Sequence, residues 1–571
     1  MPLSTLCSNQ GSNGSVISTR FAASCLLCLW AGAAANLAFA AEYYVAPNGN
    51  DGNAGTSPSS PWRTIGKANA QLKPGDVVYL RGGKYVNDPI KPSRSGAAGS
   101  EIRYVAYPGE QPVLTSSSAK GLNVAIDLTD RSYVVVDGID VDGVKPGPNA
   151  YVNHFVNLYN ASYNTISNGT FRYANGWHGI RITYEGHHNK LLDNVIDFVG
   201  VYDDGTGHDY GDAIQILRGS HHNLLRGNVI TRGAHNVLQV DAPNNIIIEN
   251  VFENDWSETE GPGKGGRNLT LMGKRNLFER NIVKNALGSA DEPANAGMKT
   301  EGQWNIVRRN YIFRNINEGI TTETHSDSKA SQNNRIYHNT IYGNGGPAWG
   351  LTFWNGDGIT GNVFKNNIVY GNRTRRDLGE ADFFFRLGSN PLGIVGQSVI
   401  EGNLLPGDAK VEVRDGGGVM SFDKAAQQYP GTFKGNIFAT PTFVSADPQA
   451  PEDFALAPGS RGIDEALPLT RTTSAGSGTV VAVADASYFF DGFGMLPGDR
   501  IQIGGGQALR ITKVDYAANT LTLAESAQWS KDAPVTLEYA GNGPDIGAYE
   551  GLPGAHARKP KPPKSLSGKL R

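Results

Sequence analysis

Lys299, Glu301 and Glu323 are the side chains of this 571-residue chain whose types and spacing best suit chemistry. Lys299 and Glu301 alternate within the segment Gly297-Met-Lys-Thr-Glu301, so in a strand both would project from the same face. Glu323 ends a similar segment, 319–323. A lysine next to a bound cation or an arginine loses part of its proton affinity and can act as a base near neutral pH. We therefore interpret the three residues as a site that removes a weakly acidic proton.

The reaction that suits this set is β-elimination from a uronic-acid polysaccharide. The proton beside the sugar carboxylate can be removed only when the charge of that carboxylate is neutralised by a cation or by strong hydrogen-bond donors. Carboxylate oxygens are ligands of the type that calcium prefers. We expect Lys299 to be the base and Ca2+ to be a cofactor. The candidate metal ligands are Glu301, Glu323 and Asp241.

Further side chains of suitable type accompany this set. His235, His325 or Tyr202 could donate a proton to the leaving oxygen. Arg181 could hold a neighbouring carboxylate through two parallel hydrogen bonds. Trp354 offers a flat surface to a sugar ring. The expected substrate-binding residues are His178, His208, Tyr202 and Trp354.

The elements that would position these residues follow from a repeat of asparagines. Paired asparagines, separated by five residues, recur seven times, and each pair brackets a short apolar segment. The repeat length is about 30 residues, which is too short for a propeller blade and too rich in strands for paired helices. The pattern predicts an all-β chain wound into a parallel β-helix. The pairs are Asn189/Asn194, Asn223/Asn228, Asn245/Asn250, Asn276/Asn281, Asn305/Asn310, Asn334/Asn339 and Asn362/Asn367.

Ordinary sheet chemistry explains the repeat. Branched residues alternate with polar ones along each predicted strand, so every second side chain fills the interior of the coil. An asparagine at a turn tolerates the left-handed backbone conformation and can stack its amide on the asparagine of the next coil. We therefore expect the asparagines to be structural. A second strand, such as 319–323, should follow the bracketed strand in each coil.

Aligning these second strands gives two columns of outward side chains. Successive coils lie about 4.8 Å apart, so Lys299, Glu301 and Glu323 should be neighbours on one face. Asp241 lies two coils from Glu301 and can join them only if a longer turn bends it in. A slip of one residue would turn Lys299 inward. One column is Arg181, Gln215, Gln239, Thr270, Lys299, Thr321 and Thr352, and the next is Thr183, Leu217, Asp241, Met272, Glu301, Glu323 and Trp354.

Residues 43–85 predict a cap on the open end of the solenoid, with a strand, a short helix around 64–72 and another strand. This segment resembles the entry to right-handed parallel β-helix proteins of the polysaccharide lyase type. That group includes the pectate lyases of family nine and the alginate and chondroitin lyases of family six. Residues 543–550 resemble its closing motif. The resemblance spans residues 43–465 and 541–551 and implies a right-handed parallel β-helix.

The resemblance also implies parts of the site. Family six enzymes use a lysine base, an arginine and calcium held by acidic and amide side chains, and Lys299, Glu301 and Glu323 are similar in type and location. The arginine has no counterpart on the next coil, where Thr321 and Thr322 stand. Family nine enzymes use a lysine with a calcium site made mainly of aspartates. The looser matches here are Asp203, Asp204, Asp209 and Asp212, in a loop that we favour as a structural calcium site.

Charge and hydropathy limit the partners. The formal net charge is -3 and the pI is near 6.4, so the bulk electrostatics predict no nucleic-acid partner. Residues 1–40 have the pattern of an export signal, with all three cysteines inside it and small residues for cleavage before Ala41. No other stretch is long and apolar enough to span a membrane. We expect a secreted or periplasmic monomer that acts on an acidic polysaccharide.

The chain divides into five parts in this interpretation. After the signal peptide, the β-helix with its N-terminal cap covers 41–469. Residues 470–540 alternate like short antiparallel strands with glycine-rich turns, which predicts a small inserted β-barrel or sandwich. We favour a structural cap for this insert over a carbohydrate-binding accessory. A closing β-helix motif at 541–554 and a basic, disordered tail at 555–571 follow.

Other functions are compatible with the same residues. A glycoside hydrolase needs two carboxyl groups that flank a bond, and Glu301 with Glu323 could be that pair, although Lys299 beside them favours elimination. A uronate epimerase would remove the same proton and return one from the opposite face. The three charged residues could also form a surface ion-pair ladder of small energetic value. In that case the protein would be a non-catalytic carbohydrate-binding or surface protein.

Overall fold

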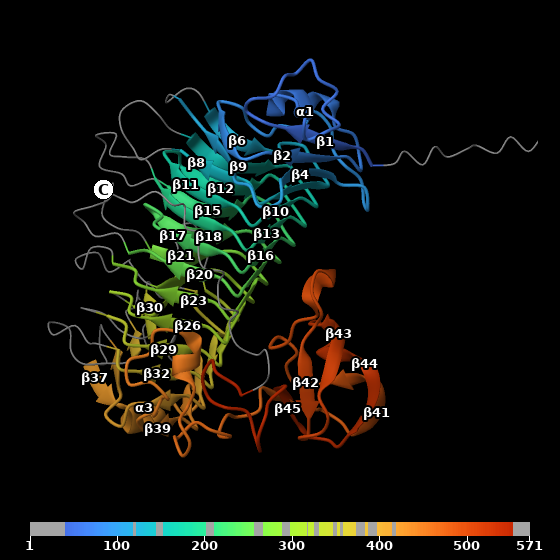
Figure 1. Ribbon diagram of the computed structural model, residues 1–571. Coiled ribbons are helices and arrows are strands. Elements are labelled where there is room, and N and C mark those ends of the chain that lie inside the picture. The colour runs from blue at the N-terminus through green and yellow to red at the C-terminus, as the bar shows by residue number, and fades with distance from the viewer. Residues whose placement is uncertain are drawn as a thin grey trace, which may run out of the picture. The chain divides into compact units, whose positions relative to one another are not determined.

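A computed structural model describes residues 40–117, 122–143, 152–200, 211–255, 267–287, 297–316, 318–324, 331–345, 351–354, 358–372, 383–385, 397–413 and 418–551. The described residues, 40–551 with these gaps, belong to one compact unit. The unit is built almost wholly of short strands that stack in parallel into a β-helix (Figure 1). The predicted all-β solenoid is therefore confirmed. The expected signal peptide at 1–40, apart from Ala40, and the tail at 555–571 lie outside the described residues.

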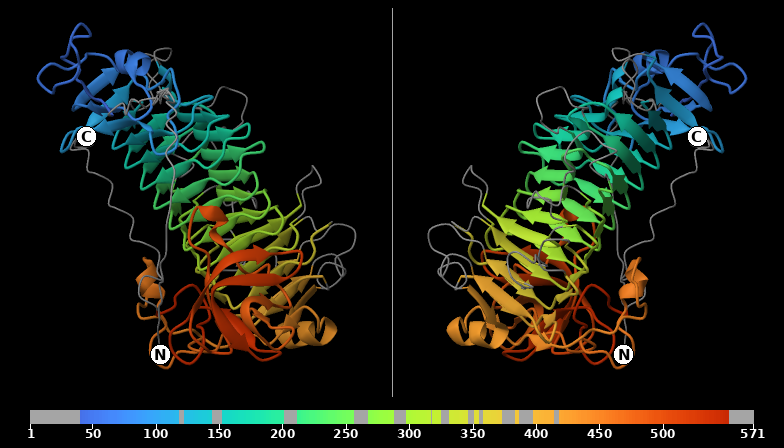
Figure 2. Two further views of the ribbon diagram at one scale, coloured as in Figure 1. Left: turned by 90° about the vertical axis from the view of Figure 1, so that its right-hand side faces the viewer. Right: turned by 90° about the vertical axis from the view of Figure 1, so that its left-hand side faces the viewer.

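Three parallel ladders form the walls of the solenoid (Figures 1 and 2). Each complete coil contributes one strand to each ladder, and the coils at the two ends lack a strand of the third. The first ladder contains β1 (Glu42–Val45), β2 (Val77–Leu80), β4 (Ile102–Ala106), β7 (Val134–Asp137), β10 (Thr165–Ser167), β13 (Lys190–Leu192), β16 (Leu224–Arg226), β19 (Ile246–Ile248), β22 (Leu277–Glu279), β25 (Ile306–Arg308), β28 (Arg335–Tyr337), β31 (Val363–Lys365), β34 (Val399–Glu401) and β38 (Phe433–Lys434).

The second and third ladders follow in each coil. The second contains β3 (Gly83–Val86), β5 (Pro112–Thr115), β8 (Asp140–Asp142), β11 (Thr170–Ala174), β14 (Val195–Val199), β17 (Val229–Thr231), β20 (Val251–Glu253), β23 (Ile282–Lys284), β26 (Tyr311–Phe313), β29 (Thr340–Tyr342), β32 (Ile368–Tyr370), β35 (Leu404–Leu405) and β39 (Ile437–Phe438). The third contains β6 (Leu122–Asp127), β9 (Val152–Tyr159), β12 (His178–Thr183), β15 (Asp212–Leu217), β18 (Asn236–Asp241), β21 (Arg267–Leu271), β24 (Met298–Thr300), β27 (Ile320–Glu323), β30 (Leu351–Trp354), β33 (Phe383–Phe385) and β36 (Lys410–Val413).

The expectation of two strands per coil is wrong, because a residue in the left-handed conformation ends the bracketed strand and a further strand follows it. Between β22 and β23 this residue is Arg280, with φ 53°. The left-handed position falls on the residue before the asparagine, as at Arg309 with φ 54°, and not on the asparagine. A turn there redirects the chain, so the next strand joins a different ladder.

The asparagines stack as predicted. Both the backbone N–H and the side-chain Nδ2 of Asn281 donate to Oδ1 of Asn310, at 2.9 and 3.1 Å. Asn310 in turn donates to Asn339 of the next coil. These side chains are fully buried, so each amide satisfies backbone groups that no strand reaches. A third amide ladder, which the sequence reasoning missed although it repeats the same five-residue spacing, comprises Asn315, Asn344 and Asn372.

Helices cover both ends of the solenoid. Near the N-terminus, α1 (Ile65–Gln71) begins at Thr64, whose hydroxyl accepts from the backbone N–H of Lys67 at 3.1 Å. This agrees with the helix predicted around 64–72. Near the far end, β37 (Gly418–Ser421) pairs antiparallel with β36 and leads into α3 (Phe422–Gln428). Apolar side chains of both helices join the main core, so each helix packs over one end of the solenoid.

Residues 470–537 form six antiparallel strands in the order β40-β45-β42-β43-β44-β41. A bridge between Thr472 and Val483 joins the two outer strands, so the sheet closes on itself, as the predicted barrel requires. The strands are β40 (Thr470–Arg471), β41 (Gly476–Ala482), β42 (Arg500–Ile503), β43 (Leu509–Asp515), β44 (Thr520–Trp529) and β45 (Pro534–Leu537), with the one-turn helix η2 (Gly492–Gly494) between β41 and β42. A second one-turn helix, η1 (Pro451–Phe454), precedes the sheet, and its Phe454 packs on the second ladder.

This C-terminal sheet covers the outward face of the first ladder. Leu224, Ile246 and Leu277 of that ladder belong to the same apolar cluster as Phe489 and Leu521. The chain then returns to the solenoid, where Ile546 and Ala548 are buried. The third ladder, which holds the predicted chemistry, stays free of this contact in the described part of the chain. No described helix is long and apolar enough to cross a membrane.

Candidate active site

The outward face of the third ladder has the register that the sequence predicts. Lys299 pairs with Thr270 on one side and with Thr321 on the other. The same column continues back through Gln239 and Gln215. It then reaches Arg181 in β12 and, in the other direction, Thr352 in β30. The prediction of strand phase is therefore confirmed along seven consecutive coils.

Alternation in β24 turns Lys299 away from the core. Met298 and Thr300 are both fully buried, and Met298 packs in the interior of the coil. Side chains one residue away must then leave through the opposite face. Lys299 is nevertheless only 5% exposed. The lysine thus lies outside the coil but is shielded from water, which argues against the alternative of an exposed surface ion-pair ladder.

The Lys299 ammonium lies between two carboxylates. It contacts a carboxylate oxygen of Glu301 and lies 3.0 Å from Oε2 of Glu323. The Glu301 side chain is fully buried, whereas 15% of the Glu323 side chain is exposed. Within the described part of the chain, neither oxygen of Glu301 accepts a hydrogen bond of good geometry. Lys299, Glu301 and Glu323 therefore form a shielded triad with one net negative charge and an under-bonded carboxylate.

The triad does not fit a calcium ion as it stands. Calcium takes six to eight oxygen ligands, whereas here the ammonium of Lys299 contacts both carboxylates. Asp241 ends β18, two strands before β24, which is about 10 Å along the ladder. Among the described residues no group of three histidine, cysteine, aspartate or glutamate side chains could hold a metal ion. Glu301, Glu323 and Asp241 are therefore not assembled as a metal site.

A second polar group lies at the N-terminal ends of β15 and β18. Oδ1 of the buried Asp212 accepts from Nδ2 of Asn236 at 2.8 Å and lies 3.1 Å from Nδ1 of His235. Asn236 also accepts from the hydroxyl of Thr270, the neighbour of Lys299, at 3.0 Å. The network therefore extends from His235 to the edge of the lysine triad.

The Asp212–His235 pair orients the imidazole. Nδ1 of His235 lies 3.1 Å from the carboxylate of Asp212 and 2.8 Å from Nδ2 of Asn236, so both side chains fix the position of the ring. The His235 side chain is 47% exposed, which leaves Nε2 available to a ligand. Sequence reasoning placed Asp212 in a possible calcium loop, named Thr270 only as a member of the outward column, and missed Asn236. One feature of the sequence could have revealed this pair. Asp212 lies two positions before the core residue Ile214, so a polar side chain stands where the alternation predicts an interior one.

The residues predicted in β12 lie farther away. Arg181 and His178 are four strands before Lys299 in the ladder, which is about 19 Å. Burial, with the charges of His154 and Arg181, lowers the pKa of His178 to about 3, so this ring is neutral at physiological pH. Its ring stacks on His154 with 4.3 Å between centroids. The structure therefore does not bring Arg181 and His178 together with Lys299.

The positions of the remaining candidates are only partly described. Trp354 pairs with Glu323 in the backbone register between β30 and β27. This agrees with the predicted column. Tyr202, His208 and His325 lie outside the described residues, as do three of the four loop aspartates, Asp203, Asp204 and Asp209.

Comparisons with known proteins agree with this architecture. A family model described as "Pel9A-like, right handed beta helix region" matches residues 43–344. Pectate lyase PEL9 of Emericella nidulans is 29% identical over 196 residues, which are 33% of this chain and 46% of that protein. Pectate lyase L of Dickeya dadantii is 24% identical over 314 residues, which are 52% of this chain and 70% of that protein. The chain thus spans about half the length of the first relative.

Among solved structures, that of pectate lyase Pel9A is 15% identical, with a TM-score of 0.47 over 90% of this chain and 97% of that chain. The family model covers more than half of the chain, and its range includes the lysine triad and the Asp212–His235 pair. The predicted right-handed coil agrees with the description of that model. The chain therefore belongs to the Pel9A-like right-handed β-helix family.

Proposed function

We propose that the protein is an exported lyase that cleaves a uronic-acid polysaccharide, such as pectate, alginate or a glycosaminoglycan, by β-elimination with Lys299 as the base. The observation that supports this most is the shielded contact between the Lys299 ammonium and the under-bonded carboxylate of Glu301. The pectate lyases among its relatives make an acidic polysaccharide the natural first substrate.

The contact offers a route to a neutral amine. Burial disfavours separate charges when their hydrogen bonds are incomplete. Transfer of one proton from Nζ of Lys299 to Glu301 converts the ion pair into two neutral groups. The free amine then takes the proton beside the substrate carboxylate, the electron pair forms a carbon–carbon double bond, and the bond to the glycosidic oxygen breaks. Glu323 remains charged and keeps the amine oriented.

The leaving oxygen needs a proton from another group. His235 precedes β18, two strands from Lys299, which is about 10 Å of ladder. This separation favours a role for His235 in holding a neighbouring sugar rather than in protonating the bond at Lys299. His325, two residues after Glu323 in the chain, is our candidate for the proton donor.

Calcium has no step in this mechanism. The triad does not fit the ion, and the loop aspartates that resemble a family nine site lie mostly outside the described residues. The charge of the substrate carboxylate must still be neutralised for proton removal. Every activity assay should therefore be run once with calcium and once with a chelator.

The decisive experiment follows the unsaturated sugar product by ultraviolet absorbance. Residues 41–571 are incubated with pectate, alginate and glycosaminoglycans, beside the variants Lys299→Met and Lys284→Met. Lys284 is a matched control, since it pairs with Glu253 at 3.5 Å on the second ladder. We expect absorbance to rise on one polymer with the parent protein and with Lys284→Met, and to fall by about 10²- to 10⁴-fold with Lys299→Met.

The other functions predict different products. A hydrolase would release reducing ends without absorbance, and an epimerase would change the sugar composition without cleavage. The Lys299 ammonium lies between the two glutamate carboxylates, and a lysine in this position favours elimination over hydrolysis. Binding of a polymer without any product would replace the proposal with a carbohydrate-binding protein.

A further inference from the structure

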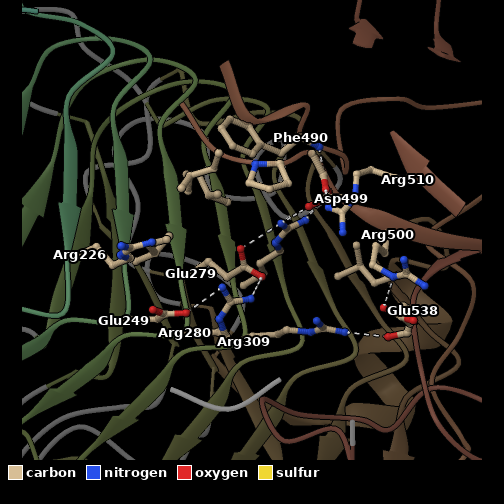
Figure 3. A pocket seen from close by; sticks show the side chains of 17 residues that line it. Arg226, Glu249, Glu279, Arg280, Arg309, Phe490, Asp499, Arg500, Arg510 and Glu538 are labelled. Carbon is tan, nitrogen blue, oxygen red and sulfur yellow. Dashed lines mark hydrogen bonds and ion pairs between the residues drawn. The ribbon is translucent and has the colours of Figure 1, made fainter. Parts of the chain in front are cut away.

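A cavity of about 550 Å³ lies where the C-terminal sheet meets the first ladder (Figure 3). Arg226, Arg280 and Arg309 enter it from the solenoid, and Arg500 and Arg510 enter it from the C-terminal sheet (Figure 3). The cavity lies on the first ladder, whereas the Lys299 triad lies on the third. The cavity is therefore separate from the proposed active site.

The four carboxylates in the wall of the cavity already have arginine partners. Two guanidinium groups each bridge two carboxylates, and a third makes a single pair. Of these pairs, the one between Arg308 and Asp499 joins the solenoid to the C-terminal sheet. The pairs are Glu249 with Arg280 (3.1 Å), Glu279 with Arg280 (3.1 Å) and with Arg308 (3.1 Å), Asp499 with Arg308 (2.6 Å), and Glu538 with Arg500 (2.7 Å).

Three further arginines line the cavity without a carboxylate partner among the described residues. Arg309 donates to the backbone oxygen of Glu538 at 3.1 Å, and Arg510 donates to that of Gly498 at 2.7 Å. Arg226 is half-buried and has no side-chain hydrogen bond in the described structure. Six guanidinium groups therefore face four carboxylates in the lining, which leaves an excess of two positive charges.

The excess positive charge in the cavity raises the free energy of the folded protein, and a bound anion would reduce this penalty. Arg308 is 1% exposed, and its Nε has no hydrogen-bond partner. Burial, with the neighbouring charges of Arg308 and Arg280, lowers the pKa of Arg309. Like charges in a shielded place repel each other more strongly than in water. A bound carboxylate would offset this repulsion and supply the missing acceptor.

Size and apolar lining favour a sugar acid over a small inorganic ion. The cavity volume falls within the usual range for organic ligands, about 300–1,000 Å³. Leu496 and Pro497 lie at its rim and are partly exposed, while Leu277 and Phe490 are buried in its wall. Such carbon-rich surfaces suit the C–H faces of a sugar ring, and guanidinium forks suit carboxylates.

We propose that this cavity is a second, non-catalytic binding site for a uronate-containing oligosaccharide, held by the unpaired guanidinium groups of Arg226, Arg309 and Arg510. The choice of a uronate rests on the proposed function. The C-terminal sheet then has two roles, because it covers the first ladder and also forms half of a carbohydrate site. A polymer long enough to bind at both sites at once would be held more tightly than at either site alone.

Isothermal titration calorimetry of residues 41–571 tests this site without any turnover. The probes are digalacturonate, a guluronate disaccharide, neutral galactobiose and inorganic phosphate. We expect one acidic disaccharide to bind, more weakly at high salt, and the neutral one not to bind. Arg226→Gln and Arg510→Gln should each weaken this binding by about tenfold or more.

Arg471→Gln is the matched control. Arg471 lies in the same sheet outside the cavity and, like Arg510, donates to a backbone oxygen, that of Asp532 at 2.8 Å. Affinity unchanged in Arg471→Gln and Lys299→Met, with unfolding temperatures unchanged in both cavity variants, supports the site. The inference is overturned if no acidic disaccharide binds, if phosphate or galactobiose binds equally well, or if only Lys299→Met loses binding. Binding at this cavity without cleavage of any polymer would contradict only the proposed function. Cleavage without binding at this cavity would contradict only this inference.

Discussion

Two charged groups in this molecule are buried to a similar degree but bonded in different ways. On the first ladder, Arg308 makes two parallel hydrogen bonds to Asp499, at 2.6 and 2.7 Å, and a third to Glu279 at 3.1 Å. On the third ladder, the ammonium of Lys299 contacts Glu301, whose oxygens accept no hydrogen bond of good geometry.

The difference separates a structural role from a chemical one. A guanidinium that reaches carboxylates through fixed, parallel bonds holds two parts of the chain in register. A compact ammonium beside an under-bonded carboxylate can exchange a proton with it. Buried groups that lack hydrogen bonds are costly, so they persist where function requires them. The comparison supports a structural role for the charged groups of the first ladder and agrees with the chemistry that we propose for the third.

Replacing Arg308 should have the largest effect on stability. Arg308→Met leaves Asp499 and Glu279 buried without their shared partner, so we expect a loss of about 3–5 kcal/mol in the free energy of unfolding. Denaturant unfolding measures this loss. Arg500→Met is the control, since Arg500 is 43% exposed, and it should cost less than about 1 kcal/mol. Equal losses in the two variants would contradict the structural role of Arg308.

His338 should make the first-ladder region sensitive to acid. Burial, with the charge of Arg309, lowers the pKa of His338 to about 3. Its Nδ1 donates to the backbone oxygen of Asp545 at 2.9 Å. Because the folded pKa lies below the unfolded value, this stability is complete above about pH 6.5 and is lost as the pH falls toward about 3.

Between pH 7 and pH 4, the loss in the free energy of unfolding should be of the order of 3 kcal/mol. Unfolding free energies measured from pH 7 to pH 4 should therefore fall less steeply in His338→Asn than in the parent protein. His235→Asn is the control, because its side chain is 47% exposed. An unchanged slope in His338→Asn would show that other groups cause the acid sensitivity.

The variant Glu301→Gln tests the chemical role that we propose for the third ladder. Glutamine keeps the shape of the side chain but cannot take the proton of Lys299. We expect turnover to fall by about 100-fold, with the folded state as stable as before or more so, because one buried charge is gone. Steady-state rates and thermal unfolding, measured on the same sample, test both parts. Full activity in Glu301→Gln would rule out proton transfer to this carboxylate.

Tyr337→Phe should have the smallest effect. The hydroxyl accepts from Nη1 of Arg308 at 3.0 Å and donates to the backbone oxygen of Tyr488 at 2.5 Å. Its loss should cost about 1 kcal/mol, as for a typical hydrogen bond. Denaturant unfolding again provides the measurement, with turnover unchanged. A cost equal to that of Arg308→Met would mean that the hydroxyl, and not the carboxylate pairs, anchors the C-terminal sheet.

Sequence reasoning predicted the site in part. The alternation of interior and outward residues in each strand places Lys299 between the core residues Met298 and Thr300, so its direction follows from local pattern alone. The third strand of each coil was missed because the turn that creates it uses ordinary residues. Arg280 in the left-handed conformation carries no glycine signal. The Asp212–His235 pair was missed because it joins two coils through their ends.

The sequence by itself determined the coil, its amide ladders and the column that brings Lys299, Glu301 and Glu323 together, because these depend on periods that repeat along the chain. Only the tertiary structure decided how deeply the triad is buried and where the C-terminal sheet packs. Arg308 and Asp499 are 191 residues apart in the chain. No periodic pattern connects such residues, so their contact and the arginine cavity beside it depend on how the two surfaces fit.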